Sequence, residues 1–158
     1  EGYGGMDLYV THLTESGWTQ PENLGAAVNT TEDELFPFIH HSGKLLFSSN
    51  GHRGFGGMDL FVTEKQTGSW IAPENMGSPI NTPSNDFSMY LNKDFTEGYF
   101  SSNRAGGMGK DDIYYLAINM PYANQEEATM EETFVSVIEP VSEFIADPVV
   151  SQITIATK

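Results

Sequence analysis

The sequence repeats itself at a fixed spacing, and this repeat limits the possible folds more than any other feature. Residues 4–11 return 52 positions later as residues 56–63, with a single Tyr-to-Phe change. The segment Pro-Glu-Asn-Leu-Gly at 21–25 returns at the same spacing at 73–77 with Met in place of Leu, and a third glycine-rich copy begins at Gly106. A period of about 50 residues indicates stacked supersecondary units, each of which buries its apolar face only against its neighbours.

Each copy consists of short apolar runs separated by turn residues, which predicts strands rather than helices. No 3.6-residue period appears, so stacked helix pairs are excluded. We expect strands over 36–41, 44–49, 58–64, 86–92, 97–102 and 111–118, and a further strand in the Trp70 segment. Four antiparallel strands in about 50 residues match one blade of a β-propeller. The predicted fold class is therefore all-β, built from blades of four antiparallel strands and ending in a short β-rich tail.

The predicted strands do not add up to a closed ring. They give two strands of a first blade, four of a second and three of a third, which is a partial propeller of about two to three blades. Propellers have four to eight blades, so the smallest needs about 200 residues, and this chain has 158. We expect the missing strands to come from residues 134–157, a neighbouring chain or flanking sequence. We rank flanking sequence first, because Glu1-Gly2 lies inside a repeat motif.

The composition changes after residue 118. All 16 glycines lie at or before Gly109, whereas residues 119–158 contain seven acidic residues and one lysine. We therefore divide the chain into a repeat region at 1–118, an acidic linker at 119–133 and a β-rich tail at 134–158. The tail either begins a separate domain or adds the missing fourth strand to the last blade.

The charge of the chain excludes several classes of partner. The 22 acidic residues against 7 lysines and arginines give a net charge of -15, which argues against binding to nucleic acid or to anionic lipid. The chain has no cysteine, so a disulfide scaffold and a Cys-ligated metal site are excluded. No apolar run approaches the length of about 18 residues that a membrane span needs, so we expect no direct membrane insertion by this segment.

The residues that recur in every copy favour a structural role. Asp7, Asp59 and Asp112 occupy one repeat position, and we expect their carboxylates to accept hydrogen bonds from the glycine-rich turn before them. The recurring Trp18 and Trp70 are expected to be buried between neighbouring units rather than to stack on a ligand. We assign the same structural role to the recurring pair Asn23 and Asn75.

Few residues remain as candidates for binding or catalysis. Arg53 and Arg104 lie in corresponding loops on one rim and are our candidates for binding an acidic partner, with lone solvated arginines as the alternative. Adjacent His40 and His41 would point to opposite faces of a strand, so we expect surface or strand-end histidines and no metal site. No nucleophile–base pattern, phosphate loop or close carboxylate pair is present, so we expect neither an enzyme nor a cofactor.

The repeat motifs resemble a known family. The motifs are Ser-Ser-Asn, a Gly-Gly loop, Asp-[Leu/Ile]-[Tyr/Phe], Trp-x-x-Pro-Glu-Asn-[Leu/Met]-Gly and [Val/Ile]-Asn-Thr. Together they are similar to the WD40-like (PD40, TolB-type) propeller repeat, in the version found in Bacteroidetes cell-envelope proteins of the OmpA family. That family includes a propeller-bearing lipoprotein of type IX secretion. The resemblance covers residues 2–118, and it implies that the second full repeat stands at the end of its propeller.

The resemblance also implies a location and a role. It implies a periplasmic or outer-membrane-associated scaffold that holds other envelope proteins, within a secretion or outer-membrane complex. In the family a carboxypeptidase-regulatory-like β-sandwich commonly follows the propeller, and Val137 to Ile145 resembles its opening. The alternative function is a propeller that binds or cleaves glycans, which needs acidic and aromatic side chains gathered at the central channel.

Overall fold

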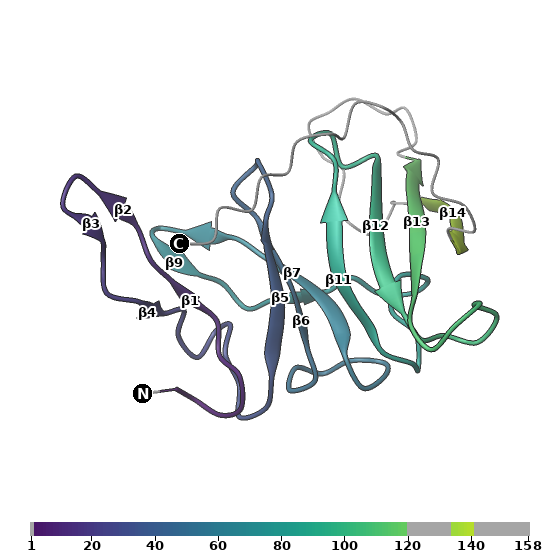
Figure 1. The fold of residues 1–158 in the computed structure, drawn as a ribbon, viewed down its shortest axis with the longest axis horizontal. Coiled ribbons are helices and arrows are strands. Elements are labelled where there is room, and N and C mark those ends of the chain that lie inside the picture. The colour runs from purple at the N-terminus through teal and green to yellow at the C-terminus, as the bar shows by residue number, and fades with distance from the viewer. Residues whose placement is uncertain (1, 120–133, 141–158) are drawn as a thin grey trace.

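The computed structural model describes residues 2–119 and 134–140, and this part of the chain contains strands and no helix. Figure 1 shows three units side by side, from the purple first unit to the green third unit. The strands are β1 (Tyr9–Val10), β2 (Leu13–Thr14), β3 (Gly17–Trp18), β4 (Glu22–Asn23), β5 (Glu34–Ile39), β6 (Leu45–Ser49), β7 (Asp59–Thr63), β8 (Lys65–Gln66), β9 (Ser69–Trp70), β10 (Glu74–Asn75), β11 (Asp86–Leu91), β12 (Glu97–Ser102), β13 (Asp112–Asn119) and β14 (Phe134–Pro140).

The strands form antiparallel sheets that follow the sequence repeat. The first unit, β1 to β4, holds the two-stranded pairs β1-β4 and β2-β3. The second unit, β5 to β10, holds a four-stranded sheet of order β10-β7-β6-β5 and the separate hairpin β8-β9. The third unit, β11 to β14, is a four-stranded sheet of order β11-β12-β13-β14.

The two four-stranded sheets share one register. Phe47 lies opposite Phe61 in the second unit, and Phe100 lies opposite Tyr114 in the third. The first strand of each sheet carries a β-bulge, at Phe36 in β5 and at Ser88 in β11, where the backbone has a φ of 52° and 57°. A bulge in an edge strand hinders pairing with another strand, so both sheets are protected in the same way at β5 and β11.

Each unit has two faces that pack differently. We call the face that carries Leu45, Phe47 and Phe61 in the second unit the leading face, because it packs on Leu8 and Val28 of the first unit. The opposite face of the second unit is the trailing face, and it packs on the third unit through Leu46, Leu60 and Val62. The third unit meets it with its own leading face, through Phe100, Tyr114 and Leu116. Because both of its faces are covered, every residue of β6 and β7 is buried.

The all-β prediction is confirmed, and the predicted strands in the second and third copies match β5, β6, β7, β11, β12 and β13. The fourth strand predicted in the Trp70 segment is present, but at the end of that segment rather than at Trp70 itself. Trp70 pairs within the hairpin β8-β9, and β10 at Glu74–Asn75 pairs with β7 instead. The turn at Thr67-Gly68 closes the hairpin β8-β9, and the chain returns to pair with β7 only after that hairpin.

The tail joins the last sheet. β14 pairs antiparallel with β13, so it stands fourth in the sheet of the third unit, as one of the two predicted roles of the tail requires. Residues 120–133 of the predicted linker and 141–158 of the predicted tail lie outside the described residues.

Candidate functional site: the polar junctions between units

The recurring aspartates close their own glycine-rich turns. Asp7 accepts a hydrogen bond from the backbone N–H of Tyr3 at 2.6 Å, and Asp59 accepts one from Phe55 at 2.8 Å. Asp112 accepts one from Met108 at 2.9 Å. The turns need glycine because the carboxylate comes so close: a methyl group at Gly54 or Gly107 would overlap the aspartate oxygen. These carboxylates therefore stabilise the loops rather than face a ligand.

Two buried asparagines pair with a strand as a backbone would. Asn81 accepts a hydrogen bond from the N–H of Leu60 and donates one to its carbonyl oxygen, both at 2.8 Å. Asn29 makes the same two bonds to Leu8. In this way the asparagine of each [Val/Ile]-Asn-Thr motif, which follows the last strand of its unit, hydrogen-bonds back to the backbone of the same unit, at Leu8 or at Leu60.

The recurring Asn23 and Asn75 support these amides. The Oδ1 atom of Asn75 accepts hydrogen bonds from the side chain of Asn81 and from the N–H of Gly77, both at 2.8 Å. Asn23 accepts the corresponding bonds from Asn29 and Gly25. Asn23 and Asn75, to which the sequence assigned a structural role, thus position the more deeply buried Asn29 and Asn81.

A buried carboxylate stands at the start of each four-stranded sheet. Asp86 has no exposed surface, and Glu34 is 1% exposed. The side-chain and backbone groups of Thr82 donate to Asp86 at 2.8 and 2.6 Å, and Ser102 donates to its other oxygen. Thr30 and Ser49 supply the corresponding donors to Glu34, where the two hydroxyls share one carboxylate oxygen and the N–H of Thr30 donates to the other. Sequence analysis missed both carboxylates, although Thr-x-x-x-[Glu/Asp] in two consecutive copies was a usable signal.

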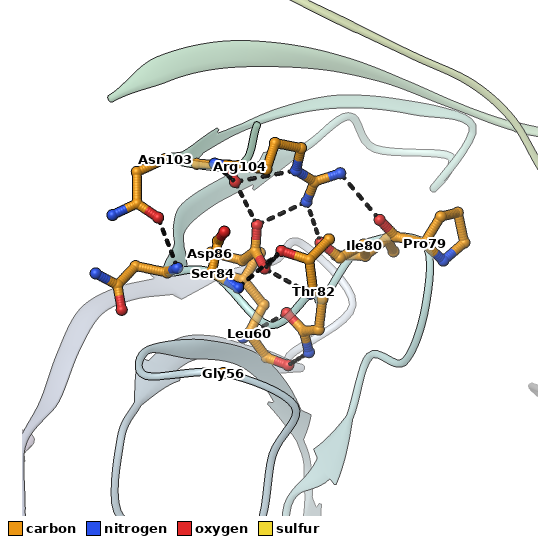
Figure 2. Close-up of polar contacts among 12 residues, drawn as sticks. Gly56, Leu60, Pro79, Ile80, Thr82, Ser84, Asp86, Asn103 and Arg104 are labelled. Carbon is orange, nitrogen blue, oxygen red and sulfur yellow. Dashed lines mark hydrogen bonds and ion pairs between the residues drawn. The ribbon is translucent and has the colours of Figure 1, made fainter. Parts of the chain in front are cut away.

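Arg104 joins this carboxylate to the preceding unit (Figure 2). Its Nη2 atom lies 2.6 Å from an oxygen of Asp86 and 2.5 Å from the carbonyl oxygen of Ile80, and Nη1 donates to Pro79 at 3.1 Å. The guanidinium also lies over the rings of Phe100 and Tyr114, about 5 Å from each centroid. Its side chain is 14% exposed. The carboxylate that Arg104 binds therefore belongs to its own chain.

His52 takes the corresponding place in the second unit. Its Nε2 atom lies 2.8 Å from the carbonyl oxygen of Val28, which corresponds to Ile80 in the repeat. The carbonyl oxygen can only accept, so Nε2 carries the proton. The imidazole packs on Phe47 and Phe61, the counterparts of the two rings beneath Arg104. At each junction one planar nitrogen-bearing group, the guanidinium of Arg104 or the imidazole of His52, thus reaches a carbonyl oxygen of the previous unit.

The other predicted residues lie apart from these junctions. Arg53 is exposed, and in the described part of the chain it has neither a hydrogen bond nor an ion pair. The prediction that both tryptophans are buried is wrong, because Trp18 is 68% exposed and Trp70 is half-buried. Trp70 packs against the core between the first and second units, whereas none of the described residues covers Trp18.

His40 takes the strand-end position, one of the two predicted alternatives for the histidines. His40 follows the end of β5, as expected, but it is buried. Its Nδ1 atom accepts from the N–H of Ser42, and its Nε2 donates to the carbonyl oxygen of Asn92 in the third unit. Ser42 and Gly43 lie in the turn after β5, and the closeness of the third unit buries the His40 ring beside it.

Two side chains at the junctions and loops have shifted acidities. Burial, together with the nearby Asp112 carboxylate, raises the pKa of the Tyr114 phenol above its ordinary value. Desolvation acts to raise the pKa of Asp7, but the N–H donors of Tyr3, Asn23 and Gly4 outweigh it and lower that pKa. Both groups therefore keep their usual charge states near neutral pH.

Within residues 2–119 and 134–140, no three His, Asp or Glu side chains gather in a way that could hold a metal ion. The same residues include no helix able to cross a membrane. The chain matches no protein-family model, no curated protein and no solved structure.

Proposed function

We propose that this chain is a non-enzymatic protein-interaction scaffold of the bacterial cell envelope, built from β-propeller blades. The proposal rests on one observation, that the recurring polar side chains bind other parts of the same chain. The aspartates, asparagines and Arg104 bind their own turns, strands and neighbouring units. Several large aromatic and aliphatic side chains stay exposed, as in Tyr99, Ile113 and Trp18. Exposed apolar groups on a rigid stack of sheets are suited to holding other proteins.

The cellular setting of the proposal comes from the repeat motifs. Their resemblance to the WD40-like repeats of OmpA-family envelope proteins supports a periplasmic or outer-membrane-associated location. It also supports partners that are themselves envelope proteins of a secretion or outer-membrane complex. The net charge of -15 fits a protein partner better than nucleic acid or anionic lipid.

The test combines crosslinking with a screen for glycan activity. A photo-crosslinking amino acid at exposed Arg53, in the loop after β6, should capture envelope proteins in cells. The same group at exposed Asp94, in the turn at the opposite end of the strands, should capture fewer. A glycan array and a glycoside-hydrolase screen should be blank. Equal crosslinking at both positions, or hydrolase activity, would contradict the scaffold role.

A second candidate function, glycan binding, is favoured by an aromatic strip along β5 and β11. Phe36 contacts Phe87 at 5.4 Å between ring centroids, and Phe38 contacts Tyr90 at 5.3 Å. Phe36 and Tyr90 are 46% and 52% exposed, which suits stacking on sugar rings. The acidic residues of these two strands, Glu34 and Asp86, are buried and bound elsewhere, so the strip favours binding over cleavage. Loss of an array signal in Phe36→Ala and Tyr90→Ala would support this function.

A further inference from the structure

The glycine-rich loop of every unit carries a large apolar residue at one fixed position. At that position the backbone N–H donates to the recurring aspartate four residues later, and the residue is Tyr3 in the first unit, Phe55 in the second and Met108 in the third. The hydrogen bond that defines the position uses only the backbone. The position therefore stays apolar through the repeat although closing the turn does not require an apolar side chain.

The second unit shows what becomes of this side chain between two neighbouring units. Phe55 lies in the loop between β6 and β7, on the lower side of the molecule in Figure 1, and its unit stands between the first and the third. Its side chain is nevertheless 55% exposed. Neither hydrophobic core cluster of the described residues includes it. Phe55 is therefore a large apolar group that the packing of one unit on the next does not use.

Close contacts on both sides hold the loop that carries Phe55. A methyl group at Gly51 would overlap the side chain of Thr30, which lies ahead of β5. A methyl group at Gly56 would overlap the carbonyl oxygen of Ser84, which lies ahead of β11. The loop therefore presents Phe55 from a fixed backbone. A binding residue on a fixed backbone loses little conformational entropy when a partner binds.

The same loop carries an unpaired cation. Arg53 stands two residues before Phe55 and is exposed, and among the described residues it has neither a hydrogen bond nor an ion pair. Lys110, in the corresponding loop of the third unit, is also exposed and has no ion pair within the described part of the chain. A guanidinium without a carboxylate of its own chain is suited to a carboxylate of another molecule.

We infer that this loop binds a protein segment that carries a carboxylate next to an aromatic or aliphatic side chain. The apolar side chain packs on Phe55, and the carboxylate pairs with the guanidinium of Arg53. Aromatic and arginine side chains are enriched among the residues that supply most of the binding energy at protein interfaces. The net charge of -15 acts at long range, where physiological salt screens it beyond about 8 Å, whereas Arg53 acts at contact distance. The inference rests on the proposed scaffold role and names its surface and the chemistry of its partner.

Selection of random peptides displayed on phage against the chain of residues 1–158 tests the inference. We expect the enriched peptides to combine Asp or Glu with an aromatic or aliphatic residue. Arg53→Glu should reverse the charge preference and enrich peptides with Lys or Arg instead. Lys93→Glu makes the same change of charge in the exposed turn between β11 and β12, at the opposite end of the strands, and should leave the preference as it is in the parent chain.

A synthetic peptide of the enriched sequence then measures each contribution by fluorescence anisotropy. Phe55→Ser should weaken its binding by about thirtyfold, the effect of losing an interface hot spot. Ile39→Ser removes an apolar side chain of similar exposure, 58%, at the far end of β5, and should bind the peptide like the parent chain. Amides in place of the carboxylates of the peptide should weaken binding by about tenfold. This last comparison uses the parent chain and does not depend on whether a variant folds.

Several results would overturn the inference. They are a selection that enriches no sequence, enriched peptides without a carboxylate, and peptides that bind Phe55→Ser and Arg53→Glu as tightly as the parent chain. Binding of the parent to vesicles of phosphatidylcholine and phosphatidylglycerol that Phe55→Ser abolishes would assign the loop to a membrane and overturn the inference as well. Envelope proteins captured in cells, together with a peptide preference that ignores Phe55 and Arg53, would leave the scaffold role standing and remove this inference alone.

Discussion

At both junctions between units a side chain bonds to a carbonyl oxygen of the preceding unit, but the residues that make the contact differ. At the second junction Arg104 bonds the buried Asp86 and the carbonyl oxygen of Ile80, while its guanidinium covers two rings. At the first junction His52 bonds only the carbonyl oxygen of Val28, and the longer Glu34 is satisfied by threonine and serine donors. The comparison teaches that the repeat preserves a geometry rather than a set of residues. It also predicts that removing Arg104 lowers the stability of the protein more than removing His52 does.

The largest effect is expected from Arg104→Ala. The substitution leaves the Asp86 carboxylate buried without its counter-ion, so we expect the free energy of unfolding to fall by about 3–5 kcal/mol. His52→Ala, which removes one hydrogen bond to a carbonyl oxygen, should cost only about 1–2 kcal/mol. Urea unfolding followed by circular dichroism measures both. Equal losses at the two sites would mean that the junctions do not differ as described.

The two tryptophans differ in their surroundings: Trp70 packs against the core between two units, whereas Trp18 is mostly exposed. Trp70→Ala should lower the free energy of unfolding by about 1–3 kcal/mol, because Trp70 packs against the core of the first junction. Trp18→Ala should change it by less than about 0.5 kcal/mol, because Trp18 is mostly exposed. Thermal unfolding of the two variants and the parent chain measures the difference. A loss at Trp18 as large as that at Trp70 would show that Trp18 is covered.

Tyr114→Phe makes the third unit resemble the second, which has Phe61 at this position. The Tyr114 hydroxyl is buried and has no hydrogen-bond partner among the described residues. Removing it should leave the protein as stable as before or more stable by about 0.5–1 kcal/mol. Urea unfolding measures this change, and a loss above about 1 kcal/mol would point to a hydrogen bond that the hydroxyl makes.

The same residue predicts a pH effect at the alkaline end. The folded state raises the pKa of Tyr114 above its ordinary value of 10.0, so the folded state holds the proton more tightly than the unfolded chain does. Its contribution to stability is therefore present below pH 10.0 and is lost as the pH rises through that value and toward the raised pKa. Ultraviolet titration of the parent chain should contain one late phenol that Tyr114→Phe lacks. An unchanged titration curve would contradict the assignment.

The smallest effect is expected at the exposed turn of the first unit. The folded state lowers the pKa of Asp7 below 3.8, so the stabilisation of this turn is present above that value and is lost as the pH falls below it. The amide signals of Tyr3 and Gly4, which donate to Asp7, should shift together as the carboxyl protonates in an NMR titration. Asp7→Asn should abolish this acid shift, and a shift that persists would have to come from another group.

The strands were predictable because their signals are local. The alternation around Phe38 and the apolar run at 45–47 indicate strands whatever lies next to them. The turn aspartates were predictable for the same reason, since their donors lie three or four residues away. The repeat itself also made the register transferable from one unit to the next.

The junction residues were not predictable in the same way. Arg104 resembles an exposed loop arginine in the sequence, but it reaches Ile80, 24 residues away, in the preceding unit. Trp18 and Trp70 both stand three residues before Pro-Glu-Asn, yet Trp70 packs against the core of the first junction and Trp18 is mostly exposed. Burial at these positions depends on which unit stands next to them, and a single repeat carries no information about its neighbour.

The central claim is that Arg104, held by the buried Asp86 of its own unit, stabilises the junction with the preceding unit, and the measurement that tests it most directly is a double-mutant cycle on Arg104 and Asp86. The cycle compares the unfolding free energies of the parent chain, Arg104→Gln, Asp86→Asn and the double variant in urea. The 2.6 Å ion pair predicts a coupling free energy of roughly 1–3 kcal/mol, with the double variant more stable than the sum of the single losses implies. Losses that add to within about 0.5 kcal/mol would contradict the claim.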